Sequence, residues 1–258
     1  MITRTRHRLA VLAAVVAGSL ALSGCSTSPS QAASKRTVVV FAAASLQESF
    51  TALAHTFEAE HPGVTVKLNF AGSDTLASSI DAGAPVDVFA AASPKAMAIV
   101  TDAGNSTGKP VTFARNQLEI AVAPGNPRRI TSLADTAVAG TKLVLCAATV
   151  PCGAAAGKAY AAAGLSPKPV SLELDVKAVL NKVALREADA GLVYVTDVRA
   201  AHGKVTGVTF SESAQALATY PIVAVGTGRD RADGSAFIAF VRSTAGQDVL
   251  ATNGFLPP

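Results

Sequence analysis

The chain has no tryptophan, few aromatic residues (5% of the total) and little net charge once its first residues are set aside. Three of its 22 basic residues, Arg4, Arg6 and Arg8, belong to an N-terminal segment without acids, and the others nearly balance the 18 acidic residues. A neutral surface exerts no long-range attraction on polyanions, and bases need aromatic side chains on which to stack. Nucleic acid is therefore excluded as an expected partner.

Several catalytic signatures are missing as well. The sequence contains no GxxxxGK[ST] phosphate loop and no GxGxxG fingerprint, and no GxSxG surrounds Ser45 or Ser73. A nucleophilic serine or cysteine needs a general base within reach, and a metal site needs paired ligands. The histidines provide neither in their spacing; they are His7, His55, His61 and His202. We therefore expect no enzyme and no resident cofactor.

The N-terminus reads as an export signal. Its basic start is followed by an apolar stretch, 9–22, that is shorter than the roughly 20 residues of a membrane-spanning helix. The sequence Leu-Ser-Gly-Cys at 22–25 resembles the bacterial lipobox, which implies a signal peptide over 1–24 and lipidation of Cys25. Residues 25–36 are small and polar, as in a flexible tether. A plain secretory leader or a short membrane anchor are the alternatives to a lipoprotein outside the cell membrane.

Two further cysteines, Cys146 and Cys152, are separated by five residues. An exported compartment favours a disulfide, and a loop of this length permits one if it doubles back. Two buried free thiols are the alternative.

The rest of the chain alternates between strand and helix patterns. Strands at 38–43, 64–70 and 85–91 alternate with helices at 46–60, 74–82 and 94–103; after paired strands at 110–115 and 118–123, a second series runs through strands 142–146, 170–174 and 190–195 and helices 153–163 and 176–187, and the chain ends with strands 205–210 and 218–225 and helices 233–243 and 245–252. This order predicts an α/β protein whose mostly parallel sheets are flanked by helices. Two such series indicate two lobes, one over 37–115 completed by 224–258 and the other over 116–223.

Two serines follow the first two strands. Ser45 and Ser73 each stand between a strand and a helix, where ligands of α/β sheets usually bind. The start of a helix offers unpaired N–H groups and a partial positive charge, so the pair predicts an anion site. The alternative for Ser45 is a plain helix cap, because Glu48 completes a capping box with it.

The second series offers further donors at equivalent places. Cys152 opens one helix, Asp175 and Val176 open another, and Tyr194 stands towards the end of a strand. The alternatives are an N-cap for Asp175 that needs no ligand and a core aromatic for Tyr194.

Five segments, taken in their order along the chain, carry a resemblance to a known family: VVVFAAASL (38–46), FAGSDTLASSIDAGAPVDVFAAAS (70–93), VPCG (150–153), LDVKAVLNKV (174–183) and DAGLVYVTD (189–197). Together they resemble the molybdate-binding proteins of bacterial ABC transporters. The resemblance implies a two-lobed type II periplasmic-binding-protein fold with the ligand cleft between the lobes. It also implies that molybdate, and usually tungstate, is held without a charged side chain.

Carried over by position, the resemblance assigns five contacts to the oxyanion. Ser45 and Ser73 would bind it through hydroxyl and backbone N–H, Cys152 and Val176 through backbone N–H, and Tyr194 through its hydroxyl. The family often has alanine at the position of Cys152, which a main-chain contact should tolerate.

These inferences predict a high-affinity, monomeric receptor that delivers molybdate or tungstate to the membrane permease of an ABC importer. Donors without a countercharge suit a fully deprotonated oxyanion. A receptor for sulfate or phosphate on the same fold is the main alternative, and a surface interaction module without a small ligand is another.

Overall fold

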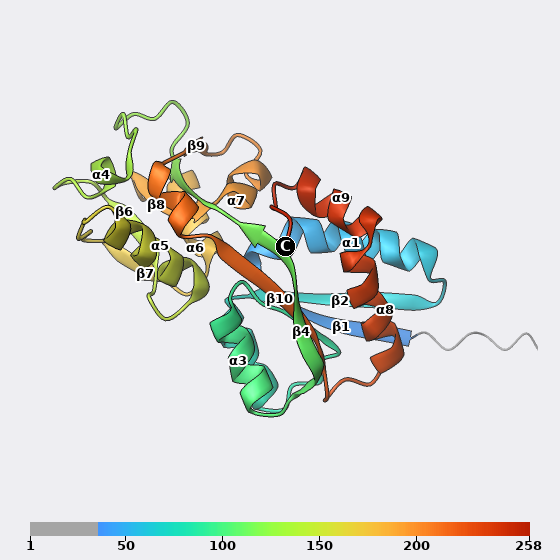
Figure 1. Ribbon diagram of the computed structural model, residues 1–258. Coiled ribbons are helices and arrows are strands. Elements are labelled where there is room, and N and C mark those ends of the chain that lie inside the picture. Colours follow the sequence, from blue (N-terminus) through green and yellow to red (C-terminus); the bar gives the residue numbers. More distant parts are fainter. Residues whose placement is uncertain (1–35) are drawn as a thin grey trace, which may run out of the picture. The chain divides into compact units, whose positions relative to one another are not determined.

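Two five-stranded sheets organise residues 36–258, which are the part of the chain that the computed structural model describes (Figure 1). The expected signal peptide, Cys25 and all of the tether except Arg36 lie outside these residues. Among the helices of 36–258, none has the length and apolar character needed to cross a membrane.

The first sheet has the strand order β2-β1-β3-β10-β4. Three strands run parallel, and β10 joins antiparallel to both β3 and β4. The strands are β1 (Arg36–Ala43), β2 (Val64–Ala71), β3 (Val88–Ala90), β4 (Ser106–Asn116) and β10 (Ala218–Val225). Its helices are α1 (Gln47–Glu60), α2 (Ser73–Asp81), α3 (Pro94–Asp102), α8 (Arg231–Arg242) and α9 (Thr244–Thr252), and the 3-10 turn η1 (Ala44–Leu46) precedes α1.

The second sheet has the order β7-β6-β8-β5-β9. Here β6 pairs parallel with β7 and β8, whereas β5 pairs antiparallel with β8 and β9. The strands are β5 (Leu118–Val122), β6 (Leu143–Cys146), β7 (Ser171–Glu173), β8 (Ala190–Tyr194) and β9 (Thr206–Val208). The helical segments of this lobe are α4 (Leu133–Thr136), α5 (Pro151–Ala162), α6 (Val176–Ala184), α7 (Val195–Ala200) and η2 (Ser211–Gln215).

The two lobes and their flanking helices agree with the α/β fold expected from the sequence, but the pairing is more mixed than expected. Half of the strand pairs in each sheet are antiparallel. In the first sheet β10 runs antiparallel to both β3 and β4, and in the second sheet β5 runs antiparallel to both β8 and β9. The expected end of the second lobe at 223 falls inside β10, which pairs with the first sheet from Ala218 onwards. The second lobe therefore ends before β10.

Helices cover both faces of the first sheet. On one face Phe50, Leu53 and Phe57 of α1 are fully buried, as their three- and four-residue spacing predicts. The ring of Phe57 meets that of Phe237 on α8 edge-on, with centroids 5.3 Å apart. On the other face α2 and α3 bury their own apolar cluster against β3 and β10. This packing holds the carboxyl ends of β1 and β2 in place.

Candidate functional site

A small cavity, with about 20 Å³ of space for the centre of a water-sized molecule, lies where the strand ends of the two lobes meet. Its size suits a compact ion better than an extended organic molecule. The lining residues are Ala43, Ala44, Ser45, Ala71, Gly72, Ser73 and Ala92 from the first lobe, and Pro151, Cys152, Leu174, Asp175, Val176 and Tyr194 from the second. The structure thus brings together all five residues that the sequence singled out.

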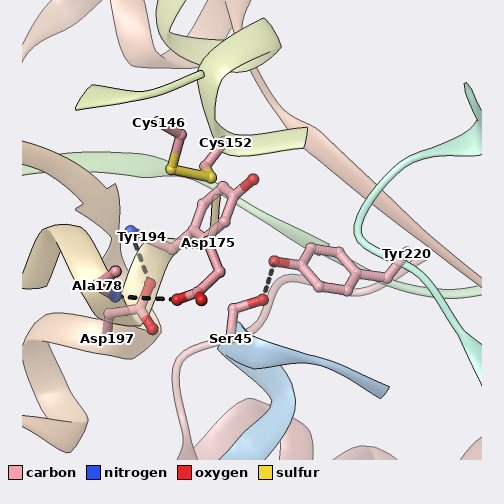
Figure 2. Close-up of a disulfide and its surroundings, with 8 residues drawn as sticks. All are labelled: Ser45, Cys146, Cys152, Asp175, Ala178, Tyr194, Asp197 and Tyr220. Atoms are coloured by element: carbon pink, nitrogen blue, oxygen red, sulfur yellow. Dashed lines mark hydrogen bonds between the residues drawn. A yellow bond between two sulfur atoms is a disulfide. The ribbon is translucent and has the colours of Figure 1, made fainter. Parts of the chain in front are cut away.

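Ser45 reaches the cavity in a way that the sequence did not predict. It belongs to η1, and Leu46 rather than Ser45 is the N-cap of α1, without a side-chain capping bond. The capping box that the sequence offered as the alternative for Ser45 is therefore wrong, because a tight 3-10 turn separates the serine from the helix. The Ser45 hydroxyl instead lies 2.8 Å from the hydroxyl of Tyr220 (Figure 2). Glu48, the partner of Ser45 in that alternative, pairs with Lys177 at 2.8 Å.

Ser73 is the first residue of α2, directly after Gly72. Its Oγ accepts a hydrogen bond from the Ala92 N–H at 3.0 Å, so the hydroxyl hydrogen remains for another acceptor. Gly72 is a point of close approach between the lobes, because a β-carbon on it would overlap the carbonyl oxygen of Leu174. Glycine at this position allows the two halves of the cavity to meet.

Cys152 lies in the first turn of α5, where it forms a disulfide with Cys146 at the end of β6 (Figure 2). The disulfide, one of the two possibilities that the sequence left open, joins the strand to the helix start. Gly153 allows the same tight approach, since a β-carbon there would overlap the carbonyl of Ala147. Together these features fix the first N–H groups of α5 against the cavity.

Val176 opens α6, and the residue before it acts as the cap. Asp175 Oδ1 accepts a hydrogen bond from the Ala178 N–H at 2.9 Å, which is the capping role that the sequence offered as its alternative (Figure 2). The cap satisfies one of the first N–H groups of the helix and leaves the Val176 N–H without an intrahelical acceptor.

Tyr194 ends β8 and is only 1% exposed. Its hydroxyl has no hydrogen-bond partner among residues 36–258, which is unusual for a buried polar group. Burial raises the pKa of this phenol well above its ordinary value, with the nearby Tyr220 and Asp197 adding to the effect. The neutral hydroxyl is therefore a donor without an acceptor of its own in the protein.

An ionic cluster that the sequence reasoning missed lies beside Tyr194. Asp197 is fully buried, and its Oδ2 accepts a hydrogen bond from the Tyr194 N–H at 3.0 Å. Its Oδ1 lies 3.3 Å from Lys177 Nζ, close enough for an ion pair but without hydrogen-bond geometry. Burial raises the pKa of Asp197 to about 6, against the opposing effect of Lys177. Since Lys177 also binds Glu48, this cluster joins α1 of one lobe to α6 of the other.

The helix starts give the cavity its chemical character. The N-termini of α2, α5 and α6 all reach it, as do η1 and the strand end that precedes α7. Unpaired first-turn N–H groups and the helix dipoles favour an anion at such a place. Within the part of the chain that the structure describes, no lysine or arginine lines the cavity, and no cluster of histidine, cysteine or acidic residues could hold a metal ion. The arrangement can therefore hold a small anion with neutral donors.

Comparisons with known proteins agree with this architecture. A family model described as bacterial extracellular solute-binding protein matches residues 38–256. The molybdate-binding protein ModA of Mycobacterium tuberculosis is 43% identical over 244 residues, covering 95% of this chain and 93% of that protein. ModA of Escherichia coli is 34% identical over 230 residues, covering 84% and 88%.

Solved structures of similar proteins have the same fold as this chain. The periplasmic molybdate-binding protein of Azotobacter vinelandii superimposes with a TM-score of 0.75 at 20% identity, covering 86% of this chain and 99% of that one. The resemblance to molybdate-binding proteins that the sequence motifs indicated is thus confirmed over nearly the whole chain. Such relatives are solute-binding receptors and not enzymes. From its matching residues, its two lobes and its cavity between them, the chain belongs to the family of bacterial extracellular solute-binding proteins.

Proposed function

We propose that this chain is a high-affinity extracytoplasmic receptor for molybdate, which it delivers to the permease of an ABC importer. The observation that carries the proposal is the Tyr194 hydroxyl, a buried donor at the cavity with no partner in residues 36–258. A buried donor without an acceptor costs about 1–3 kcal/mol. An oxyanion oxygen in the cavity would remove that cost.

The proposed contacts are all hydrogen-bond donors. Ser45 and Ser73 contribute hydroxyl and backbone N–H, Cys152 and Val176 contribute backbone N–H, and Tyr194 contributes its hydroxyl. Each of the five is at most 5% exposed, so the bonds would form away from water, where they are strongest. A tetrahedral dianion offers four oxygens that only accept, which matches such a set.

Two considerations favour molybdate over the other oxyanions. The relatives that are 43% and 34% identical bear the name molybdate-binding protein. Hydrogen phosphate also needs an acceptor for its remaining proton, and the main-chain N–H groups proposed here cannot accept one. Tungstate has the charge and shape of molybdate, and we extend the proposal to it. Sulfate on the same donors is the alternative, to be separated by size: donors spaced for longer metal–oxygen bonds lose alignment on a smaller ion.

The cellular setting is part of the same proposal. Lipidation of Cys25 would anchor the receptor outside the cell membrane, with the tether of 25–36 leaving the lobes free to meet the permease. We propose that it works as a monomer, since one pair of lobes supplies every contact.

Thermal unfolding of the mature chain, stripped of bound anions, tests the ligand class. Molybdate, tungstate, sulfate and phosphate are added singly to an anion-free buffer. An anion at 100 times its dissociation constant adds roughly 2.7 kcal/mol, which raises the midpoint by about 5–10 °C for a chain of this size. We expect that rise with molybdate and tungstate. A rise with sulfate alone would favour the alternative, and no rise with any of the four would overturn the proposal.

A further inference from the structure

We propose that Asn116 and Tyr220 form a hydrogen-bond relay that fixes Ser45 as a donor to the bound anion and thereby selects against protonated oxyanions. Neither Asn116 nor Tyr220 lines the cavity, so both act through Ser45 as positioning residues. This inference rests on the function proposed above and adds to it a cause of selectivity.

The relay begins at the end of β4. Asn116 is fully buried, and its Oδ1 accepts a hydrogen bond from the Gln117 N–H at 3.0 Å. With the oxygen engaged there, the amide nitrogen faces the other way and donates to Thr196 Oγ1 at 2.9 Å and towards the Tyr220 hydroxyl at 3.4 Å. The neighbours of the amide therefore decide which end of it meets Tyr220.

Tyr220 links the Asn116 amide to the Ser45 hydroxyl and determines which of these hydroxyl groups donates. Its side chain is fully buried, and its oxygen lies within hydrogen-bond distance of Asn116 Nδ2 and Ser45 Oγ. The amide nitrogen has no lone pair to offer, so it can only donate to the phenol oxygen. The phenol hydrogen then requires an acceptor, and among residues 36–258 the Ser45 oxygen, 2.8 Å away, is the one with hydrogen-bond geometry; the Tyr194 hydroxyl also lies near Tyr220 but without that geometry. Tyr220 therefore donates to Ser45.

The hydrogen bond from Tyr220 determines where the hydroxyl hydrogen of Ser45 points. Because its oxygen already accepts from Tyr220, its own hydrogen is left to point into the cavity that it lines. Ser73 is held in the same sense, since its oxygen accepts from the Ala92 N–H. Chains of hydrogen bonds polarise one another, which strengthens the terminal donor.

A fully deprotonated oxyanion can accept from every one of these donors. Hydrogen phosphate would present its own O–H to a serine oxygen that already accepts one hydrogen bond and whose hydrogen points at the anion, so only its second lone pair remains for that proton. Asp175 lines the cavity and carries acceptor oxygens; its Oδ1 accepts from the Ala178 N–H at the start of α6, and its Oδ2 is not among the proposed contacts of the anion. Loss of the Tyr220 hydroxyl would free Ser45 to turn and accept, which would relax the selectivity.

The test compares Tyr220→Phe with a matched control, Tyr160→Phe. Tyr160 is also a buried tyrosine whose hydroxyl binds a single side-chain hydroxyl, that of Thr136 at 2.6 Å, but it lies in α5 and does not line the cavity. Dissociation constants of the mature chain for molybdate and sulfate are measured by calorimetry. Phosphate is measured by its ability to displace molybdate.

For Tyr220→Phe we expect molybdate and sulfate, both without protons at neutral pH, to bind about three- to tenfold more weakly. Phosphate should lose less or gain, so that the preference for molybdate over phosphate narrows while the preference over sulfate stays. Tyr160→Phe should change neither preference. In a Ser45→Ala background, Tyr220→Phe should cause no further change, because the relay then has no terminal donor.

Other outcomes overturn the inference. These are unchanged molybdate affinity in Tyr220→Phe, an equal loss for all three anions, or an undiminished effect in the Ser45→Ala background. Failure of the wild-type chain to bind any of the anions would overturn the proposed function itself, which distinguishes the two failures.

Discussion

Replacing Gly72 with alanine adds one methyl group, which should weaken ligand binding without lowering the stability of the ligand-free fold. A β-carbon there would overlap the carbonyl oxygen of Leu174, which belongs to the other lobe. The backbone angles of Gly72, φ −57° and ψ 135°, suit alanine as well as glycine. Within its own lobe the new carbon would lie 3.7 Å from Thr75 Oγ1, an ordinary contact. Gly72→Ala therefore opposes the closed cleft and leaves each lobe intact.

The magnitude follows from the type of clash. Overpacking by one methyl group costs about 1–3 kcal/mol. Because both lobes must close on the anion to contact it, this cost appears in binding, and molybdate affinity should fall about 5- to 150-fold. Calorimetric titration with molybdate measures the loss. The unfolding midpoint without ligand should change little.

Gly157→Ala provides the control. This glycine lies in α5, and a β-carbon on it would meet nothing within 4 Å. We expect unchanged molybdate affinity and a gain of up to about 1 kcal/mol in stability from helix propensity. The reasoning about Gly72 is refuted if Gly72→Ala binds molybdate as the wild type does. It is equally refuted if that variant melts well below the wild type in the absence of ligand.

Three further outcomes can be measured. Tyr194→Phe removes a buried donor without a partner, so its ligand-free unfolding midpoint should be unchanged or higher while molybdate affinity falls at least about tenfold; a lower midpoint with full affinity would contradict the proposed contact. Burial raises the pKa of Asp197 from 3.8 to about 6, so the folded state holds this proton more tightly than the unfolded one. Stability from this group is therefore greatest below about pH 4 and falls by about 3 kcal/mol as the pH rises through 6 to about 7. Asp197→Asn should abolish that part of the fall in urea titrations across this range, and parallel curves for the two proteins would count against it. Reduction of the Cys146–Cys152 disulfide should lower the free energy of unfolding by about 2 kcal/mol and weaken molybdate binding, because the start of α5 would then move. Thermal melts with and without a reductant, and the same melts on Cys146→Ser, measure the change in stability. An unchanged midpoint would show that the bond is dispensable.

The sequence predicted the site better than it predicted how the site is held. The strand–serine–helix junctions at Ser45 and Ser73 brought both serines to the cavity because parallel strands end at one edge of a sheet. The capping box at Ser45 matched in spacing and was still wrong, since spacing does not reveal a 3-10 turn between strand and helix. Local patterns thus located the residue and gave it the wrong partner.

What the sequence could not supply depends on distant pairs. Tyr220 is 175 residues from Ser45, and Lys177 is 129 residues from Glu48. β10 reads from its sequence only as a buried strand, and its membership of the first sheet is decided by pairing with β3 and β4. The short helices α4 and α7 span too few residues for an apolar period to emerge. Each of these features follows from the tertiary fold.

The helix starts at α5 and α6 have a consequence for how this site tolerates mutation. At Cys152 and Val176 the proposed donor is a main-chain N–H, which nearly every amino acid carries. Exchanging the Val176 side chain for another of similar volume would leave its donor in place, and an exchange at Cys152 would keep the N–H but lose the disulfide that holds it, whereas proline alone would delete either donor. A receptor constructed in this way would drift widely in sequence at contact positions like that of Val176 and keep its ligand. At these positions the backbone conformation, and not the identity of the side chains, would then preserve ligand recognition.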